Sequence, residues 1–272
     1  MNKTFDFQNH TISYNIAGSG PAIVLLHGFL ETKEIWLEFS DTLSSEFTVI
    51  TLDLPGHGNS ETLADIHSMK LMGEVVKTLI NILKINEVVI AGHSLGGYVA
   101  GEFAMNFPQL VKGLVFFHSH AAPDTDEAKE NRRRSLNIVK QNHAGFIMQF
   151  IPDLFDQKYV DNFRNQIEML QNRASGMKPE AITAAIAGMR DRPGSLPYLF
   201  TTEKPVLFII GKQDTRLSYN VVLAQALIPA HSEVLLLDDV GHMGFIEAPR
   251  QTKQALRHFA QKCFEPEESA RS

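Results

Sequence analysis

The sequence predicts an α/β fold, a mostly parallel, doubly wound sheet with helices on both faces and an inserted helical cap. Two observations lead to this prediction. Short apolar runs bounded by turn residues alternate with longer stretches of helical spacing, which is typical of strand–helix units in a parallel sheet. Between residues 121 and 199 the alternation stops, and each element predicted there is a helix.

The predicted strands are short and strongly apolar. Residues 4–17 contain two of them, on either side of Gln8 and Asn9. Six further runs have the near-continuous apolar character of strands that are buried on both faces. They are residues 22–26, 48–52, 88–91, 113–117, 205–210 and 233–237.

Helices are predicted where apolar residues recur three or four positions apart. Four such stretches lie between the strands or after the last one, at residues 65–84, 95–107, 219–228 and 247–262. Four more fill the inserted segment, at residues 124–139, 146–155, 160–170 and 179–189. The segment begins near Asp124, which with Glu127 resembles a capping box, and it ends at the chain breakers of residues 192–197.

These elements divide the chain into a sheet-bearing core, residues 1–120 and 200–272, and a helical cap, residues 121–199. Ligands of doubly wound sheets bind at the carboxyl ends of the strands. We therefore expect the cap to act as a lid over a site at that edge of the sheet.

The composition narrows the class of protein. With 44% hydrophobic and 21% charged residues, the 272-residue chain has the balance of an ordinary globular protein. Its net charge of −6 disfavours nucleic-acid binding, which needs a basic excess. The sequence shows no signal peptide and no apolar run of the roughly 20 residues that a membrane helix needs, and its single cysteine, Cys263, allows no internal disulfide. We expect a cytoplasmic protein that acts on a small molecule and binds no nucleic acid; its oligomeric state is not predicted.

The stretch from Gly92 to Gly96 matches G-x-S-x-G between a predicted strand and a predicted helix, which is the context of a nucleophile elbow. Such a turn is so sharp that a Cβ at either flanking glycine would collide with backbone. It lifts the hydroxyl of Ser94 above the sheet at a helix N-terminus, where N–H groups favour negative charge. The alternative is a tight turn whose serine only caps the helix, and the motif by itself leaves both interpretations open.

A serine nucleophile needs a base, and the base needs an acid that orients it. Asp214 and His242 each follow one of the last two predicted strands, so in a parallel sheet both lie at the same edge as Ser94. The order Ser, Asp, His along the chain is the one that this architecture uses. Asp238 and Asp239 are closer to His242 in sequence, but they end a strand and are expected in a turn.

The other histidines lack the partners of a base. His27 and His57 are expected to brace loop backbone. His118 and His120 could form a metal pair, but no third ligand lies at a suitable spacing, so we predict no metal site and no cofactor. Surface positions are expected for the histidines without a partner pattern, which are His10, His67, His143, His231 and His258.

Attack on a carbonyl requires fixed N–H donors for the developing oxyanion. One is expected from Leu95, the residue after the nucleophile. The turn at Gly28, after the first core strand, would free the N–H of Phe29 as the second donor. The sequence here is H-G-F rather than the H-G-G-G of some lipases, and the alternative is that it only turns the chain.

With these residues in place, the chain resembles the α/β-hydrolase superfamily, and most of all its small capped esterases and lactonases. The loop from Asp53 to Ser60 matches D-x-P-G-x-G-x-S, a family element with a structural, site-bracing role. The resemblance covers residues 4–119 and 200–264, whereas the cap matches only as a helical insertion. It implies the following roles: nucleophile Ser94, general base His242, orienting acid Asp214, and oxyanion-hole amides Phe29 and Leu95.

The resemblance implies a cofactor-independent serine hydrolase that cleaves a small carboxylic ester, thioester or lactone through an acyl-enzyme intermediate. Two alternatives remain open. The same triad could hydrolyse a C–C bond or act as a perhydrolase, or the protein could be a ligand receptor that retains a triad and signals through a protein partner.

The cap supplies candidates for the substrate pocket. Its apolar stretch at residues 146–155 either lines an acyl pocket as a lid or provides the contact between cap and core. The run Arg132 to Arg134 either attracts an anionic substrate or forms a solvated helix face. The pocket residues predicted are His93, Phe146, Phe150 and Met243.

Overall fold

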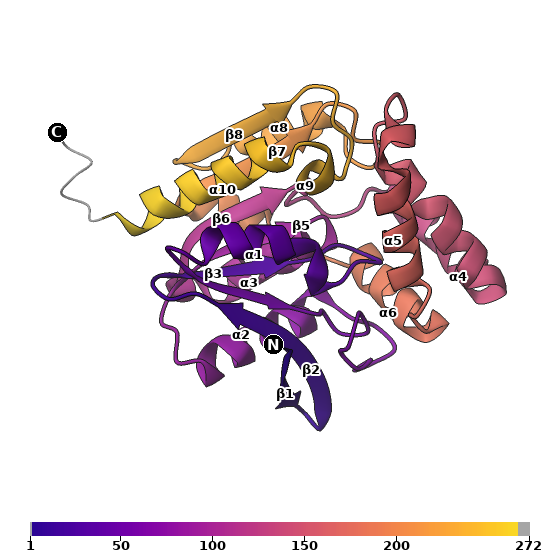
Figure 1. The fold of residues 1–272 in the computed structure, drawn as a ribbon, viewed down its shortest axis with the longest axis horizontal. Helices are drawn as coiled ribbons and strands as arrows, with labels where there is room; N and C mark the ends of the chain where they lie inside the picture. Colours follow the sequence, from indigo (N-terminus) through magenta and orange to yellow (C-terminus); the bar gives the residue numbers. More distant parts are fainter. Residues whose placement is uncertain (1, 266–272) are drawn as a thin grey trace.

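A computed structural model describes residues 2–265, and an eight-stranded sheet runs through its centre (Figure 1). The strand order is β1-β2-β4-β3-β5-β6-β7-β8. β2 is antiparallel to both of its neighbours, and all other neighbouring strands are parallel. The strands are β1 (Lys3–Phe7), β2 (His10–Ala17), β3 (Ala22–Leu26), β4 (Thr48–Leu52), β5 (Val88–His93), β6 (Val111–Phe117), β7 (Val206–Gly211) and β8 (Ser232–Leu237). The predicted doubly wound, mostly parallel sheet is confirmed.

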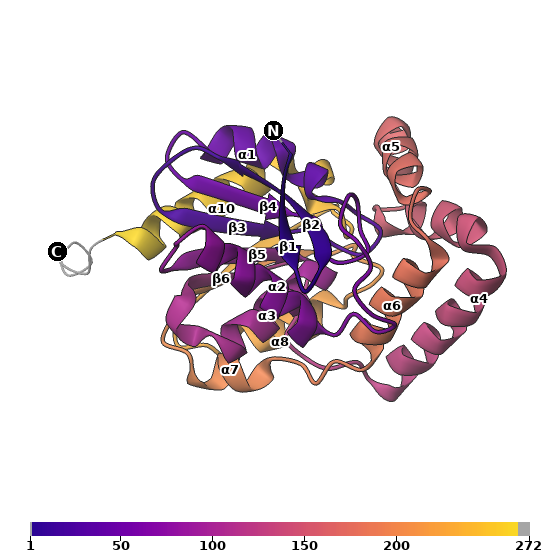
Figure 2. The ribbon, with the colours of Figure 1, turned by 90° about the horizontal axis from the view of Figure 1, so that it is seen from below.

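Helices cover both faces of this sheet. The core helices are α1 (Leu37–Leu43), α2 (Met69–Ile82), α3 (Leu95–Asn106), α8 (Tyr219–Ala226), α9 (Gly244–Glu247) and α10 (Pro249–Phe264), and η1 (Lys33–Trp36) and η2 (Pro108–Leu110) are single 3₁₀ turns. Figure 2 shows α1 and α10 on one face and α2, α3 and α8 on the other. None of the helices within residues 2–265 combines the length and the apolar character that a bilayer crossing requires.

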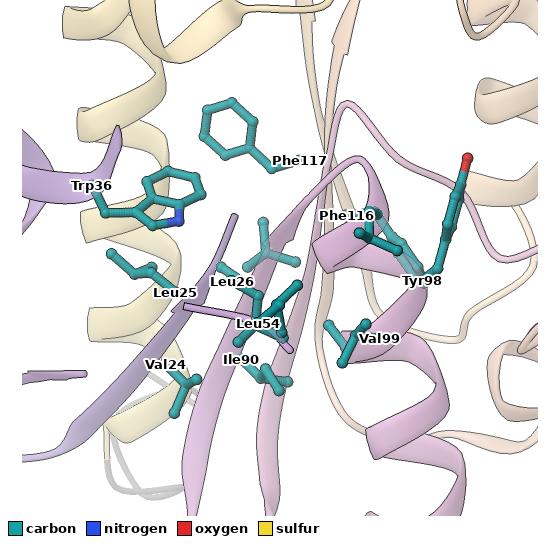
Figure 3. Packing of buried hydrophobic residues seen from close by; sticks show 14 of the residues in the cluster. Val24, Leu25, Leu26, Trp36, Leu54, Ile90, Tyr98, Val99, Phe116 and Phe117 are labelled. Atoms are coloured by element: carbon teal, nitrogen blue, oxygen red, sulfur yellow. The ribbon is translucent and has the colours of Figure 1, made fainter. Parts of the chain in front are cut away.

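Successive side chains of β6 pack into the hydrophobic core on opposite faces of the sheet. Phe116 and Phe117 point to opposite faces of the sheet, as neighbours on a strand must (Figure 3). Phe117 meets Trp36 edge to face at 5.5 Å between ring centroids, and Phe116 stacks on Phe208 at 5.2 Å. Since every residue of β3 and β5 is buried, the apolar runs at these positions are explained by burial on both faces.

Residues 118–205, all of which the structure describes, contain no strand. They form α4 (Asp126–Phe150), η3 (Pro152–Leu154), η4 (Val160–Phe163), α5 (Arg164–Ala174), α6 (Pro179–Arg190) and α7 (Leu196–Thr201). In Figures 1 and 2, α4, α5 and α6 stand together beside one end of the sheet, whereas α7 packs on α3. The helix α7 therefore runs across residue 199, where the cap was predicted to end. The division into core and cap domains stays a prediction, and residues 1 and 266–272 of the predicted core lie outside the described residues.

The start of the insertion differs from the prediction. Thr125, not Asp124, caps α4, and its hydroxyl accepts a hydrogen bond from the N–H of Ala128 at 3.2 Å. Asp124 instead forms ion pairs with Arg132 and Arg192, at 2.8 and 2.6 Å. Asp124 does not cap the helix because its carboxylate oxygens, which a cap would use, are bound to two guanidinium groups instead.

His67, predicted at the surface, is fully buried. Its Nε2 accepts a hydrogen bond from the N–H of Leu63 at 3.2 Å, and burial lowers its pKa to about 4. Helix α6 covers it, since the N–H of His67 donates to the carbonyl of Ala184 in α6 at 3.0 Å. The prediction was wrong because the partner is more than a hundred residues away in the sequence.

The loop from Asp53 to Ser60 is built around a buried ion pair. Lys33 Nζ lies 2.5 Å from the Asp53 carboxylate, and both side chains are almost fully buried. The same carboxylate accepts hydrogen bonds from the N–H groups of Lys33 and Asn59, at 2.8 and 3.0 Å. Ser60 closes the loop by donating to the Asp53 carbonyl at 2.7 Å. These contacts tie the start of η1, which follows the predicted oxyanion turn, to the end of β4.

Replacing Lys33 by Met removes this cation while Asp53 stays buried. An uncompensated buried charge costs about 3–5 kcal/mol, so K33M should unfold at a much lower denaturant concentration than the unmodified chain. The double variant Lys33→Met with Asp53→Asn should recover part of that loss.

Lys112→Met is the matched control, because Lys112 and Glu87 form a half-exposed pair 3.8 Å apart. It should change the free energy of unfolding by less than about 1 kcal/mol. Equal losses in K33M and K112M, measured by urea unfolding, would contradict a bracing role for the buried pair.

Candidate active site

Ser94 sits in a strained turn between β5 and α3. Its backbone angles, φ +49° and ψ −112°, lie in a region that non-glycine residues rarely adopt. A Cβ at Gly92 would lie 2.1 Å from the carbonyl of Gly96, and one at Gly96 would lie 2.5 Å from the oxygen of Leu26. Among the described residues the Ser94 hydroxyl makes no capping hydrogen bond to α3. The sharp glycine-flanked turn is therefore present, and a helix-capping role does not account for the serine.

Asp214 and His242 meet at the same edge of the sheet. Asp214 lies in the loop after β7, His242 in the loop after β8, and His242 Nδ1 is 2.7 Å from Asp214 Oδ2. The other carboxylate oxygen accepts hydrogen bonds from the N–H groups of Arg216 and Leu217, at 2.8 and 3.0 Å. Burial opposes the carboxylate charge, but the charge and hydrogen bond of His242, together with the nearby His118 ring, hold the pKa of Asp214 below its usual range.

His118 is a second imidazole beside the same carboxylate. Its Nδ1 is 3.5 Å from Asp214 Oδ2, and burial lowers its pKa to about 4, so the ring is neutral at pH 7. A Cβ at Gly244 would lie 2.2 Å from its Nε2, which shows how tightly the ring is enclosed. Ligand atoms of His118, Asp214 and His242 lie within 4.8 Å of one another, as a metal site would need, but the Asp214–His242 hydrogen bond already occupies two of them.

The loop that carries His242 is held by a carboxylate that sequence reasoning missed. Glu247 accepts hydrogen bonds from the N–H groups of Gly241, Met243 and Asp156, at 3.1, 2.9 and 2.8 Å. The N–H of His242 itself donates to the carbonyl of Leu154 at 2.7 Å. Burial raises the pKa of Glu247, and the three N–H donors act against that shift. The predicted base is thus fixed through its backbone to residues 154–156 of the insertion.

Of the two predicted oxyanion amides, Leu95 follows Ser94 in the chain and Phe29 lines the same cavity as Ser94. Leu95 is the first residue of α3, and N–H groups in the first turn of a helix have no partner within that helix. Phe29 lies in the turn after β3, where the N–H of Gly28 donates to Glu31 Oε2 at 2.6 Å. Within residues 2–265 we find no acceptor for the N–H of Phe29. The role of both amides as oxyanion donors stays a prediction.

A buried ion pair lies beneath this turn. His93 Nδ1 is 3.0 Å from Glu31 Oε2, and His93 Nε2 is 2.8 Å from the carbonyl oxygen of His242. Both partners can only accept, so both ring nitrogens donate and the ring is an imidazolium. Burial opposes this charge, but Glu31 raises the pKa of His93 above its usual value. Glu31 had no sequence signal, because its partner comes from another strand end.

These residues surround a cavity of about 260 Å³, at the small end for ligand sites. Ser94, His242, Phe29 and two of the predicted pocket residues, His93 and Phe150, line it. Phe146 and Met243 are buried but do not line it, and Phe146 stacks behind Phe150 at 5.4 Å between ring centroids. The other lining residues are Glu31, Tyr98, Ala128, Asn131, Arg132, Ser135, Leu154, Met189, Thr215, Arg216 and Leu217.

The histidines that were expected to brace backbone do so. His27 Nε2 accepts from the N–H of Leu54 at 2.9 Å, and His27 Nδ1 lies 2.7 Å from the carbonyl of Gly28. His57 Nδ1 lies 3.1 Å from the carbonyl of Pro55. Their rings are 5.0 Å apart, and burial lowers the pKa of both. They support the walls of the site without lining the cavity.

Comparison with known proteins adds independent findings. A family model described as the α/β hydrolase fold matches residues 21–136. An uncharacterized protein of Mycobacterium tuberculosis is 44% identical over 266 residues, covering 91% of this chain and 77% of that protein. The (E)-2-((N-methylformamido)methylene)succinate hydrolase of Acinetobacter baylyi is 26% identical over 261 residues, covering 94% of this chain and 97% of that hydrolase. A thermophilic esterase from Thermogutta terrifontis, solved with malate bound, is 30% identical with a TM-score of 0.90, covering 97% of this chain and 100% of the esterase.

Glu31→Gln tests the charged state of His93. The imidazole would lose its carboxylate while staying buried, so its pKa should fall from above to below about 6.5, measured by NMR titration of the ring proton. In the unmodified chain the pKa of His93 is higher in the folded than in the unfolded state, so the stability that the pair contributes is lost as the pH rises through the folded pKa. In E31Q the folded pKa would be the lower one, so the dependence of stability on pH should reverse.

Glu38→Gln serves as the control, because its carboxylate is exposed on α1. It should leave the titration of His93 unchanged. An unaltered His93 pKa in E31Q would refute the imidazolium assignment.

Proposed function

The chain belongs to the α/β-hydrolase family, and on that premise we propose that it is a serine hydrolase for a small carboxylic ester, thioester or lactone. Ser94 is the proposed nucleophile, His242 the base and Asp214 its orienting acid. The observation that carries the proposal is the 2.7 Å hydrogen bond between Asp214 and His242 beside a strained serine in one cavity.

In this proposal Asp214 holds the His242 ring through Nδ1–H and leaves Nε2 to take the proton from the Ser94 hydroxyl. The serine oxygen attacks the carbonyl, and the N–H groups of Phe29 and Leu95 stabilise the oxyanion. His242 then gives its proton to the leaving oxygen or sulfur, which leaves an acyl-enzyme. Water, deprotonated by the same ring, releases the acid.

The comparisons support this chemistry at the level of reaction class. The protein from Thermogutta terrifontis is an esterase and that of Acinetobacter baylyi a hydrolase, and both are covered almost completely by the alignment. The Ser94 geometry favours a nucleophile because a strained backbone at a non-glycine residue is retained where function requires it.

A fluorophosphonate probe and a series of p-nitrophenyl esters of increasing chain length test the proposal. The probe should label the chain at Ser94, and short esters should be hydrolysed. Ser94→Ala should abolish labelling and reduce turnover by about 10⁶-fold while melting as the unmodified chain does.

Two results separate the alternatives. Absence of both labelling and ester turnover would refute the serine hydrolase. Labelling without turnover of any ester would leave the C–C hydrolase or perhydrolase and the receptor as alternatives, and a ligand-dependent pull-down of partner proteins would then test the receptor.

Asp214→Asn tests the orienting acid. The amide cannot stabilise an imidazolium and favours the wrong tautomer of His242, so kcat should fall by about 10⁴-fold, as it does in serine proteases. Asp238→Asn is the control, since the exposed Asp238 pairs with Lys212 at the end of β8. Comparable loss of kcat in D238N, or none in D214N, would exclude Asp214 from this role.

A further inference from the structure

We propose that the substrate carries a carboxylate, which Arg132 and Arg216 bind in the cavity that both side chains line. This inference rests on the proposed function, because it assigns the substrate class of the same site. Both arginines line the cavity together with Ser94 and His242. The reasons lie in where the two guanidinium groups sit and in the hydrogen-bond donors that Arg132 leaves free.

Arg132 comes from the polar face of α4. Residues 128, 131, 132 and 135 line the cavity, and their spacing places them on one side of a helix. The Arg132 side chain is 25% exposed, whereas those of Arg133 and Arg134 are 57% and 70% exposed. The arginine run therefore splits: one member faces the site and the other two form the solvated face of the helix.

The charge of Arg132 is only partly satisfied. Its Nε donates to Asp124 at 2.8 Å, but the same carboxylate also receives Arg192 at 2.6 Å. Within residues 2–265 the two terminal nitrogens of Arg132 have no hydrogen-bond acceptor. Those nitrogens form the fork that binds a carboxylate in bidentate fashion.

Arg216 reaches the cavity from the loop after β7. Its guanidinium lies over the ring of Phe150, 4.4 Å from the centroid, and 3.7 Å from the largely exposed Asp153 carboxylate. Burial lowers the pKa of Arg216; the charges of Asp153 and Asp214 act against this shift, and the positive charge of Arg132 acts with it. Two like charges that repel each other across a cavity gain from an anion placed between them.

The other charged groups near the cavity have partners of their own. Glu31 is paired with the His93 imidazolium, and Asp214 is hydrogen-bonded to His242. Around the two arginines, three guanidinium groups with Arg192 face two carboxylates, Asp124 and Asp153. Asp214 adds a third carboxylate charge near Arg216, since a base that accepts the serine proton carries no charge beforehand. An anion is therefore favoured by the free guanidinium fork of Arg132 beside Arg216, and not by an excess of positive charge.

The other residues that line the cavity restrict the size and polarity of the rest of the substrate. Phe29, Phe150 and Leu154 are apolar, and the cavity of about 260 Å³ admits a short chain only. Asn131, Ser135 and Thr215 add neutral hydrogen-bonding groups next to the arginines. A short ester or lactone with one free carboxylate, such as the monoester of a small dicarboxylic acid, fits these walls.

The test compares an acid with its neutral counterpart. The substrates are mono-p-nitrophenyl glutarate and methyl p-nitrophenyl glutarate; 4-acetoxybenzoate and its methyl ester place the carboxylate on the alcohol side instead. The unmodified chain should favour the acid of at least one pair in kcat/KM. In Arg132→Gln and in Arg216→Gln that preference should fall about tenfold or more, mainly through KM, as expected for a lost charge-assisted hydrogen bond.

Arg133→Gln is the matched control, one residue along the same helix and on its solvated face; it should keep the preference. Because Arg192 still holds Asp124 in R132Q, that variant should melt close to the unmodified chain, and R216Q provides an independent measurement. Turnover of both esters with no preference for either acid, or a preference that survives both substitutions, would overturn the carboxylate site and leave the proposed hydrolase standing.

A binding measurement covers the case in which no ester is hydrolysed. Calorimetry with glutarate, and with glutaramide as the neutral control, requires no turnover. Weaker glutarate binding in R132Q and R216Q than in R133Q would support the anion site even if the proposed hydrolase fails. No glutarate binding to the unmodified chain, together with no turnover, would refute both.

Discussion

The approach of α3 to the end of β3 sets the geometry of the site. At Gly96 a single added methyl group would lie 2.5 Å from the carbonyl oxygen of Leu26, and at Gly92 it would strike the first turn of the helix. This contact forces the strained backbone of Ser94 and brings the turn of residues 27–31 directly beside it. The proposed nucleophile and both proposed oxyanion amides thus follow from one close packing of helix on strand, which only glycine permits.

Contacts between imidazole and carboxylate groups stabilise the loops that this packing brings together around Ser94. Glu31 holds His93 as a cation, whereas Asp214 lies between His242 and the neutral ring of His118. Burying a carboxylate is costly unless hydrogen bonds and opposite charge compensate it. His93 also donates to the backbone carbonyl of His242, so the two contacts are joined and the base is fixed from both its ring and its main chain.

The sequence was sufficient for the sheet, for the elbow and for the pairing of Asp214 with His242, because each follows from a local pattern plus the rule that parallel strands end at one edge. It was not sufficient for Glu31 and His118, since each acts through a partner from a different strand end, or for Glu247, whose partners are loop N–H groups that leave no mark in the sequence. The same reason explains His67, which α6 covers. The polar wall of α4 was visible only as an arginine run until the fold showed which arginine faces inward.

The insertion and the loop of His242 form one mechanical unit. The carbonyl of Leu154 and the N–H of Asp156 are hydrogen-bonded, directly or through Glu247, to the backbone on either side of the proposed base. Exchange of the insertion between relatives therefore cannot use the sheet boundaries as its joints. A chimera that keeps these hydrogen bonds has to carry residues 241–247 along with residues 152–156.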